Sequence, residues 1–213
     1  MDFAAARHTM VESQLRPNRI VDSRVVDAMA TLARENFVPA ALRAVAYVDE
    51  DIPLGNGRFL MEPMVFARLA QSAELNAGAR VLVVGSGCGY GANVFASMGA
   101  KVVALENDVD FAAQTRRACG ATVTVVEGAF AGGWPTLAPY DAIIFDGAIG
   151  GLPEAYAAQV GEGGRILAVV AAPGQPGKAT LWQKFAGNLT ARVLFDAGTP
   201  VLPGMALEPG FVF

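Results

Sequence analysis

From residue 80 onward, short apolar runs alternate with stretches whose apolar residues recur at helical spacing. The apolar runs predict buried strands, and the stretches between them predict amphipathic helices. Continuous apolar strands separated by helices are typical of a parallel sheet covered on both faces. The predicted strands span residues 80–85, 101–106, 122–128, 140–147 and 163–171, and the predicted helices span 90–99, 108–119 and 153–160.

The pattern before residue 80 is mainly helical, and the last forty residues are β-rich. Residues 21–33 predict a helix that Asp22 or Ser23 caps and whose apolar stripe is Val25, Val26, Met29 and Leu32. Further helices are predicted over 38–46 and 64–75, with a turn-rich segment, 49–63, between them. The final residues, from 180 to 213, predict an antiparallel hairpin that closes the sheet. The fold class expected is therefore α/β, with a doubly wound and mostly parallel sheet.

Composition and charge narrow the kind of protein. The chain has 213 residues, of which 53% are hydrophobic and 17% charged, and a net charge of −4. This fits one folded domain and disfavours a nucleic-acid or membrane partner. Two cysteines are too few for a disulfide framework, and the first residues lack the apolar run of a signal peptide, so we expect a cytoplasmic location. His8 is the only histidine, which argues against a histidine-rich metal site and a histidine-dependent triad.

Glycines stand at every second position in VVGSGCGYGANVF, residues 83–95, between a predicted strand and a predicted helix. This geometry brings backbone close to a ligand at the edge of a sheet. Tyr90 occupies the third glycine position of a dinucleotide fingerprint, which argues against a nicotinamide cofactor, and no Lys-Ser/Thr pair completes a P-loop. Glu106 ends the next strand, where a carboxylate can accept ribose hydroxyls. Together these features are typical of class I S-adenosylmethionine-dependent methyltransferases, although a tight strand-to-helix turn without a ligand remains an alternative.

Several segments, taken together, resemble the protein-L-isoaspartate O-methyltransferases. They are residues 10–58, VLVVGSGCGYGANVFASMGAKVVALE, VEGAFAGGWPTLAPYDAIIFDGA and VGEGGRILAVV. The resemblance implies a seven-stranded Rossmann-like methyltransferase sheet with extra N-terminal helices. It also implies S-adenosyl-L-methionine as cofactor and methyl transfer to an isoaspartyl carboxylate of a damaged protein. We expect one domain over 1–213, with a helical substrate-side region, 1–78, and a cofactor-binding core, 79–213, in a monomer or homodimer.

The resemblance also assigns cofactor contacts residue by residue. The glycine turn would line the methionine part of the cofactor, and the ends of the second and third strands would contact the ribose and the adenine. The turn residues are Val84, Gly85, Ser86, Gly87 and Gly89, the ribose residues Glu106 and Asn107, and the adenine residues Glu127 and Gly128. Glu127 replaces the aspartate that the family usually has.

Two departures from the family pattern concern the methyl acceptor. The family's Thr-Ile-Ser-x-Pro segment places a serine hydroxyl beside the accepting carboxylate, and here the segment is Phe59-Leu60-Met61-Glu62-Pro63. Met61 supplies a thioether, a poor hydrogen-bond partner, and Glu62 adds a negative charge. Asp146-Gly147 stands where the family commonly has Thr-Ala; an acid there can face the cofactor, bind substrate or act as a base. The candidate catalytic residues are therefore Met61, Glu62 and Asp146, with Asp146 also a candidate cofactor contact.

The leading interpretation is a methyltransferase of the isoaspartate type that acts on a protein or peptide. The altered acceptor segment leaves two alternatives open. One is a methyltransferase with a different acceptor, including a small molecule. The other is a catalytically silent protein that binds S-adenosylmethionine. A nicotinamide-dependent oxidoreductase is a weaker alternative, which Tyr90 opposes.

Overall fold

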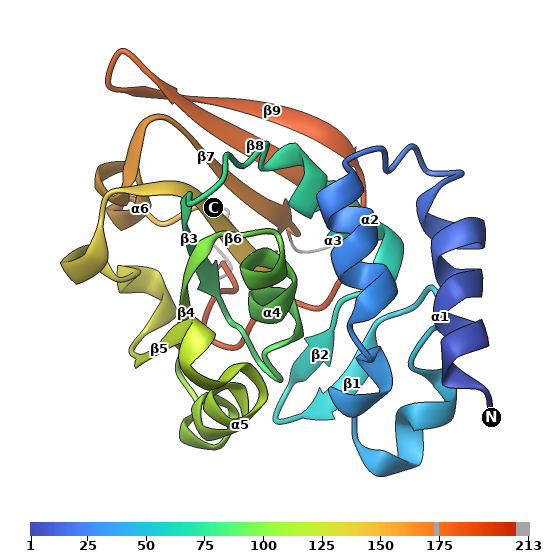
Figure 1. Ribbon diagram of the computed structural model, residues 1–213. Coiled ribbons are helices and arrows are strands. Elements are labelled where there is room, and N and C mark those ends of the chain that lie inside the picture. The colour runs from blue at the N-terminus through green and yellow to red at the C-terminus, as the bar shows by residue number, and fades with distance from the viewer. Residues whose placement is uncertain (173–174, 208–213) are drawn as a thin grey trace.

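The computed structural model describes residues 1–172 and 175–207, and its centre is a seven-stranded sheet (Figure 1). The strand order is β5-β4-β3-β6-β7-β8-β9. The strands are β3 (Arg80–Val84), β4 (Lys101–Glu106), β5 (Val123–Glu127), β6 (Tyr140–Ile149), β7 (Val160–Val170), β8 (Lys178–Phe185) and β9 (Asn188–Asp196). The first five run parallel, and β8 and β9 are antiparallel to their neighbours. The predicted doubly wound, mostly parallel sheet and its C-terminal hairpin are confirmed; the last residues of that segment, 208–213, lie outside the described residues.

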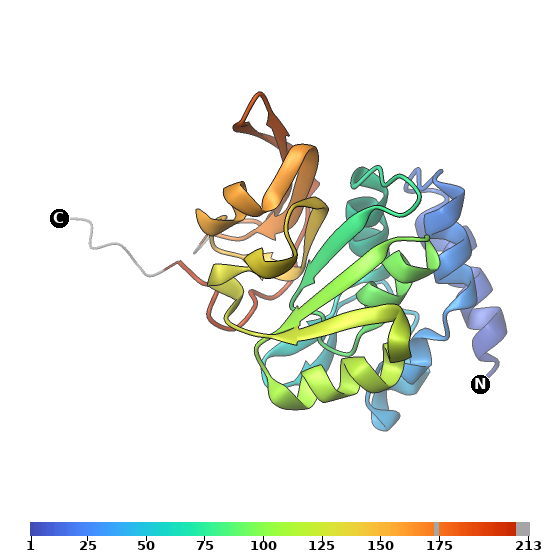
Figure 2. The same cartoon turned by 60° about the vertical axis from the view of Figure 1, so that its left-hand side comes forward.

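Each parallel strand buries side chains on both faces, so two apolar layers form. Helices from the N-terminal part of the chain cover one face, and Val81 and Val83 of β3 point into that layer. Figure 2 shows these helices on one side of the sheet and α6 on the other. The helices are α1 (Phe3–Met10), which continues as a π-helical segment (Val11–Leu15), α2 (Ser23–Thr31), α3 (Pro63–Ser72), α4 (Tyr90–Ser97) and α5 (Val109–Cys119).

The opposite face is covered by short elements. Leu82 and Val84 of β3 point into this second layer, together with Phe130 and Leu202. The elements that cover this face are the 3₁₀ turns Phe130–Gly132 and Pro135–Leu137, the short helix α6 (Ala155–Gln159) and the segment 200–205. Residues far apart in the sequence therefore meet over β3.

The turn-rich segment expected over 49–63 contains a regular hairpin, β1 (Ile52–Gly55) with β2 (Arg58–Leu60). Asn56 and Gly57 at its turn both have positive φ, 48° and 70°, which suits the two-residue turns that match strand twist. An Asn-Gly pair between apolar residues is a strong hairpin signal, and the sequence interpretation overlooked it.

The predicted helix over 38–46 is a 3₁₀ helix, Ala40–Val45, that begins after Pro39. The other predicted helices are present, and each end lies within three residues of its expected position. Asp22 caps α2, because its side chain accepts a hydrogen bond from the Arg24 amide. Among the described residues, none of the helices combines the length and apolarity needed to span a bilayer.

Candidate functional site

The candidate site lies at the C-terminal edge of the sheet, where β3 and β4 end and the neighbouring β6 continues to Ile149. Val84 on β3 is in register with Leu105 on β4 and Phe145 on β6. The residues that follow these three positions are Gly85, Glu106 and Asp146, so they lie side by side. Ligands of open α/β sheets bind at this edge.

The glycine turn adopts backbone conformations that other residues avoid. Gly85, Gly87 and Gly89 have φ values of 76°, 53° and 85°, all in the left-handed region. The Gly85 amide donates to the Leu105 carbonyl at 2.9 Å, and the Gly89 amide donates to the Ser86 carbonyl at 2.8 Å. The turn therefore closes tightly over the end of β3 and leads into α4. Cys88 within it is buried, and burial raises the pKa of its thiol to about 12, so this cysteine fills space rather than acting as a nucleophile.

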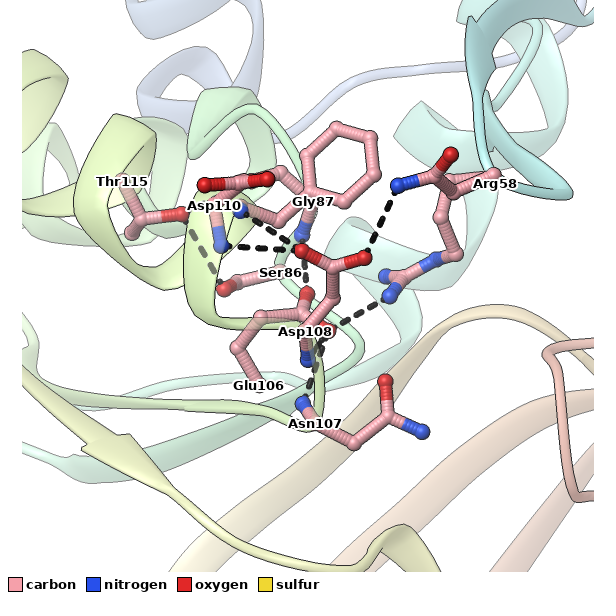
Figure 3. A network of polar contacts seen from close by, with 10 residues as sticks. Arg58, Ser86, Gly87, Glu106, Asn107, Asp108, Asp110 and Thr115 are labelled. Atoms are coloured by element: carbon pink, nitrogen blue, oxygen red, sulfur yellow. Dashed lines mark hydrogen bonds and ion pairs between the residues drawn. The ribbon is translucent and has the colours of Figure 1, made fainter.

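Glu106 joins β4 to the glycine turn (Figure 3). Its side chain is fully buried. Oε2 accepts a hydrogen bond from the Gly87 amide at 2.8 Å, and Oε1 accepts one from the Asn107 amide at 2.8 Å. The structure thus places the predicted ribose acceptor directly against the predicted methionine-binding turn.

Arg58 is the functional residue that the sequence interpretation missed. It lies on β2 and its side chain is 2% exposed, with Nη1 only 2.6 Å from Glu106 Oε1. Its guanidinium lies over the rings of Phe111 and Phe130, at 5.5 and 5.3 Å from their centroids. Within the described part of the chain Nη2 has no hydrogen-bond partner. Arg58 and Glu106 are 48 residues apart in the sequence, and no local sequence pattern predicts a contact between them.

Leu202, from the C-terminal segment, fills the space beside Arg58. A Cβ built on Gly85 would lie 2.8 Å from a methyl carbon of Leu202 and 3.1 Å from Arg58 Nη2. A Cβ on Gly147 would lie 2.6 Å from the same leucine. The backbone of the turn is therefore in direct contact with two side chains from other parts of the protein.

The predicted adenine residues lie at the end of β5. The Glu127 side chain is 44% exposed and pairs with Arg116 of α5, with 2.7 Å between Nη2 and Oε1. The Trp134 ring packs on Gly128, where an added Cβ would come within 3.2 Å of it. The Trp134 ring and the half-exposed Glu127 carboxylate thus lie at the end of β5, the strand next to the one that carries Glu106.

Asp146 lies within the buried run of β6 and faces α4. A Cβ on Gly91 would lie 2.7 Å from Asp146 Oδ2 and 3.0 Å from the Phe66 ring. Burial raises the pKa of the Asp146 carboxyl to about 7, although Arg58 and Arg34 oppose this shift. Oδ1 has no hydrogen-bond partner among the residues the structure describes. Asp146 is thus a buried carboxyl whose pKa lies near neutrality.

In the altered acceptor segment, Met61 is buried in the core and Glu62 is partly exposed. The Met61 residue is 1% exposed, and its carbonyl accepts a hydrogen bond from Nη2 of the buried Arg34 at 2.6 Å. Glu62 precedes α3, and its amide donates to Asp51 Oδ1 at 2.9 Å. Burial, with Asp49, Asp51 and Glu50 nearby, raises the pKa of the Glu62 carboxyl to about 7. The two neighbours therefore have different environments: Met61 packs in the core, and Glu62 lies in an acidic surface region.

The groups at the sheet edge fit S-adenosylmethionine in their chemistry. A glycine turn without bulky side chains can approach the methionine part, and a strand-end carboxylate can accept ribose hydroxyls. The Arg58 and Leu202 side chains lie against the same turn, because a Cβ on Gly85 would come within 3.1 Å of Arg58 and 2.8 Å of Leu202. Strand order, turn and strand-end acid define the class I methyltransferase fold.

Comparison with known proteins identifies the family within that class. The model of the protein-L-isoaspartate (D-aspartate) O-methyltransferase family matches residues 6–195. A protein-L-isoaspartate O-methyltransferase of Methylorubrum populi is 42% identical over 173 residues, which are 80% of this chain and 82% of that protein. One from Methanoculleus marisnigri is 39% identical over 168 residues, covering 77% and 76% of the two chains. The chain belongs to the protein-L-isoaspartate O-methyltransferase family.

Solved structures agree in fold. A protein-L-isoaspartate O-methyltransferase superimposes with a TM-score of 0.81 at 22% identity, covering 94% of this chain and 67% of the other. A Plasmodium falciparum protein of the same description, solved with S-adenosyl-L-homocysteine, gives a TM-score of 0.79 at 20% identity, covering 92% and 97%. The resemblance inferred from the sequence motifs is confirmed.

Proposed function

We propose that this protein is an S-adenosylmethionine-dependent methyltransferase that methylates the carboxylate of isoaspartyl residues in damaged proteins. The observation that carries the proposal is the contact between Glu106 and the glycine turn, with 2.8 Å from the Gly87 amide to Oε2. It stands in a chain that belongs to the isoaspartyl methyltransferase family.

The cofactor-binding roles follow from position. The turn residues Val84, Gly85, Ser86, Gly87 and Gly89 hold the methionine part, because their backbone faces the edge where Glu106 ends β4. Glu106 and Asn107 bind the ribose, and Glu127 and Gly128 lie against the adenine with Trp134 as a wall. The bound cofactor supplies an activated methyl group, and the protein's task is to position the acceptor and exclude water.

A carboxylate acceptor needs no base, but two of the candidate catalytic residues, Glu62 and Asp146, are acidic and would repel it if both were ionised. Glu62 and Asp146 both have a pKa of about 7, so a large fraction of each is neutral at physiological pH. A neutral carboxyl does not repel an anionic acceptor, and it can donate a hydrogen bond. Glu62 therefore takes the place of the hydroxyl that the family's serine provides, Asp146 lies on the cofactor side, and Met61 supplies packing behind them.

Methyl ester formation on paired peptides tests the proposal. The protein is incubated with methyl-labelled S-adenosylmethionine and a peptide that contains isoaspartate, and in parallel with the same peptide containing aspartate. We expect base-labile label on the isoaspartyl peptide alone. The control variant is Gly87→Val, which we expect to be inactive because a branched residue is strained at φ 53° and would stand in the cofactor's position. Equal labelling by the variant, or none by the natural protein, contradicts the proposal.

A changed acceptor is the second candidate, and the loss of the serine hydroxyl at Met61 favours it. Glu62, Asp49, Glu50 and Asp51 form an acidic surface region that suits a cationic acceptor better than an anionic one. Met61→Ser separates the two. A gain of isoaspartyl activity would mark residue 61 as part of the acceptor site, whereas label on amines with none on isoaspartate would establish the second candidate.

The partner is a protein or peptide substrate, or a small-molecule acceptor in the second candidate. We place the protein in the cytoplasm, as a monomer or homodimer. Residues 1–78 form the substrate side and 79–213 the cofactor-binding core of one domain.

A further inference from the structure

Two segments that are distant in sequence meet over the glycine turn. One is the β1–β2 hairpin, and the other is the segment 200–203; we call the two together the cover. A Cβ on Gly57 in the hairpin turn would lie 3.4 Å from Pro203 Cγ, so the segments are in contact. Backbone hydrogen bonds between Ala148 on β6 and the carbonyl of Pro200 and amide of Leu202, of 3.0 and 2.8 Å, hold the second segment against the sheet.

Arg58 is hydrogen-bonded to Oε1 of Glu106, the carboxylate that we propose as the ribose acceptor. Oε2 of Glu106 accepts from the Gly87 amide, and Oε1 accepts from the Asn107 amide, the Asp108 amide at 3.3 Å and Arg58 Nη1. The backbone amides belong to the site and cannot leave, whereas the guanidinium comes from the cover. Figure 3 shows Arg58 approaching Glu106 from the side of the hairpin. Among the described residues Arg58 is the only side chain that donates to this carboxylate, so it occupies a position on Oε1 that a ribose hydroxyl would otherwise take.

The cover also has attachments that can be released. Asn56 at the hairpin turn donates to Asp108 Oδ2 at 3.0 Å, and this bond is exposed to solvent. The backbone of Leu202 is hydrogen-bonded to β6, but its side chain over Gly85 is held by packing alone. Arg58 Nη2 has no partner in the described part of the chain, so the guanidinium is not fully satisfied where it lies. An incompletely bonded buried group calls for an explanation, and a functional role is one such explanation.

We propose that Arg58 is an internal ligand of the cofactor site: in the free protein it takes the ribose's place on Glu106, and S-adenosylmethionine binds by exchange with it as the cover moves. This inference rests on the proposed function. In the absence of the cofactor the cover is closed, and the Arg58–Glu106 pair then competes with cofactor binding. The apparent affinity for the cofactor is then reduced by the fraction of molecules in which Arg58 has left Glu106.

Arg58→Met tests the exchange, because it keeps the length of the side chain and removes the guanidinium. In the variant Glu106 loses its cation and becomes a buried carboxylate in need of a partner, which the ribose hydroxyls supply. We expect Arg58→Met to have a lower melting temperature than the natural protein without ligand. We expect it to bind S-adenosylhomocysteine at least about fivefold more tightly in calorimetry, with a larger rise in melting temperature.

Arg165→Met is the matched control. Arg165 pairs with Glu74, with 2.5 Å from Nη2 to Oε2, at the opposite edge of the sheet. Its loss should leave the affinity for S-adenosylhomocysteine unchanged. Leu202→Ala is a second test variant, which keeps the Arg58–Glu106 pair and removes packing that holds the cover closed. It should also bind S-adenosylhomocysteine more tightly than the natural protein. It replaces Arg58→Met as the test if that variant does not fold.

The outcomes separate the inference from the proposed function. Equal or weaker binding of S-adenosylhomocysteine by Arg58→Met, or by Leu202→Ala in its place, overturns the exchange and leaves the proposed function intact. No binding by the natural protein or by any variant overturns both. Tighter binding by the test variant, with the Arg165→Met control unchanged, establishes Arg58 as the competing ligand.

Discussion

At the scale of single residues, the carboxyl groups of the site differ most in what surrounds them. Glu106 has three hydrogen-bond donors within 2.8 Å, one of them a cation, whereas Asp146 Oδ1 has none among the described residues. The same edge of the sheet thus holds one fully bonded carboxylate and one carboxyl whose pKa burial raises to about 7. The sequence predicted that both acids lie at this edge, but it could not predict their environments, because Arg58 and Leu202 arrive from distant segments.

The raised pKa of Asp146 predicts how stability depends on pH. An unfolded aspartate has a pKa near 3.9, so between about pH 4 and 7 the native state holds a proton that the unfolded state has lost. The free energy of unfolding from this group is therefore highest below pH 4 and falls as pH rises towards 7. Asp146→Asn should remove this loss and be more stable than the natural protein at pH 8, by a few kcal/mol at most.

Urea denaturation at pH 4.5, 6 and 8 measures the effect. The gain from Asp146→Asn should grow with pH over this range. A gain that is constant with pH would mean that Asp146 has an ordinary pKa.

At the scale of elements, the β1–β2 hairpin supplies the arginine that pairs with Glu106. Its Asn56-Gly57 turn is encoded locally, and the turn directs Arg58 towards Glu106. Asp108 connects this hairpin to α5: Oδ1 accepts from the Asp110 and Phe111 amides as the helix cap, and Oδ2 accepts from the Asn56 side chain. The strands and helices could be predicted from periodicity, whereas this connection depends on packing between elements.

Asp108→Ala removes the cap and the hairpin contact together. We expect the free energy of unfolding to fall by about 1 kcal/mol, as for other lost caps. We also expect faster amide hydrogen exchange in residues 52–60, because the hairpin loses its attachment to α5. Asp22→Ala removes a comparable cap from α2 and should not change exchange in the hairpin. Unchanged exchange in Asp108→Ala would show that the Asn56 contact does not hold the hairpin.

At the scale of the whole molecule, one edge of the sheet collects groups from the entire chain. The glycine turn and Glu106 come from the centre, Arg58 from the N-terminal third and Leu202 from the C-terminal segment. The sequence was sufficient for the sheet, the turn and the family, because each has a local pattern or motif. The closed cover could not be predicted. The Arg58–Glu106 pair and the contact of Leu202 with the glycine turn both join segments that are far apart in the sequence, and no local pattern indicates which distant segments will meet.

The central claim is that Glu106 and the glycine turn form the cofactor site, with Glu106 as the ribose acceptor. Calorimetric titration with S-adenosylhomocysteine of Arg58→Met and of the double variant Arg58→Met/Glu106→Gln tests it most directly, because neither protein contains the competing guanidinium. We predict that the double variant binds at least about tenfold more weakly, since hydrogen bonds to a charged group contribute roughly 1.5–3 kcal/mol. Equal affinity of the two variants would contradict the claim.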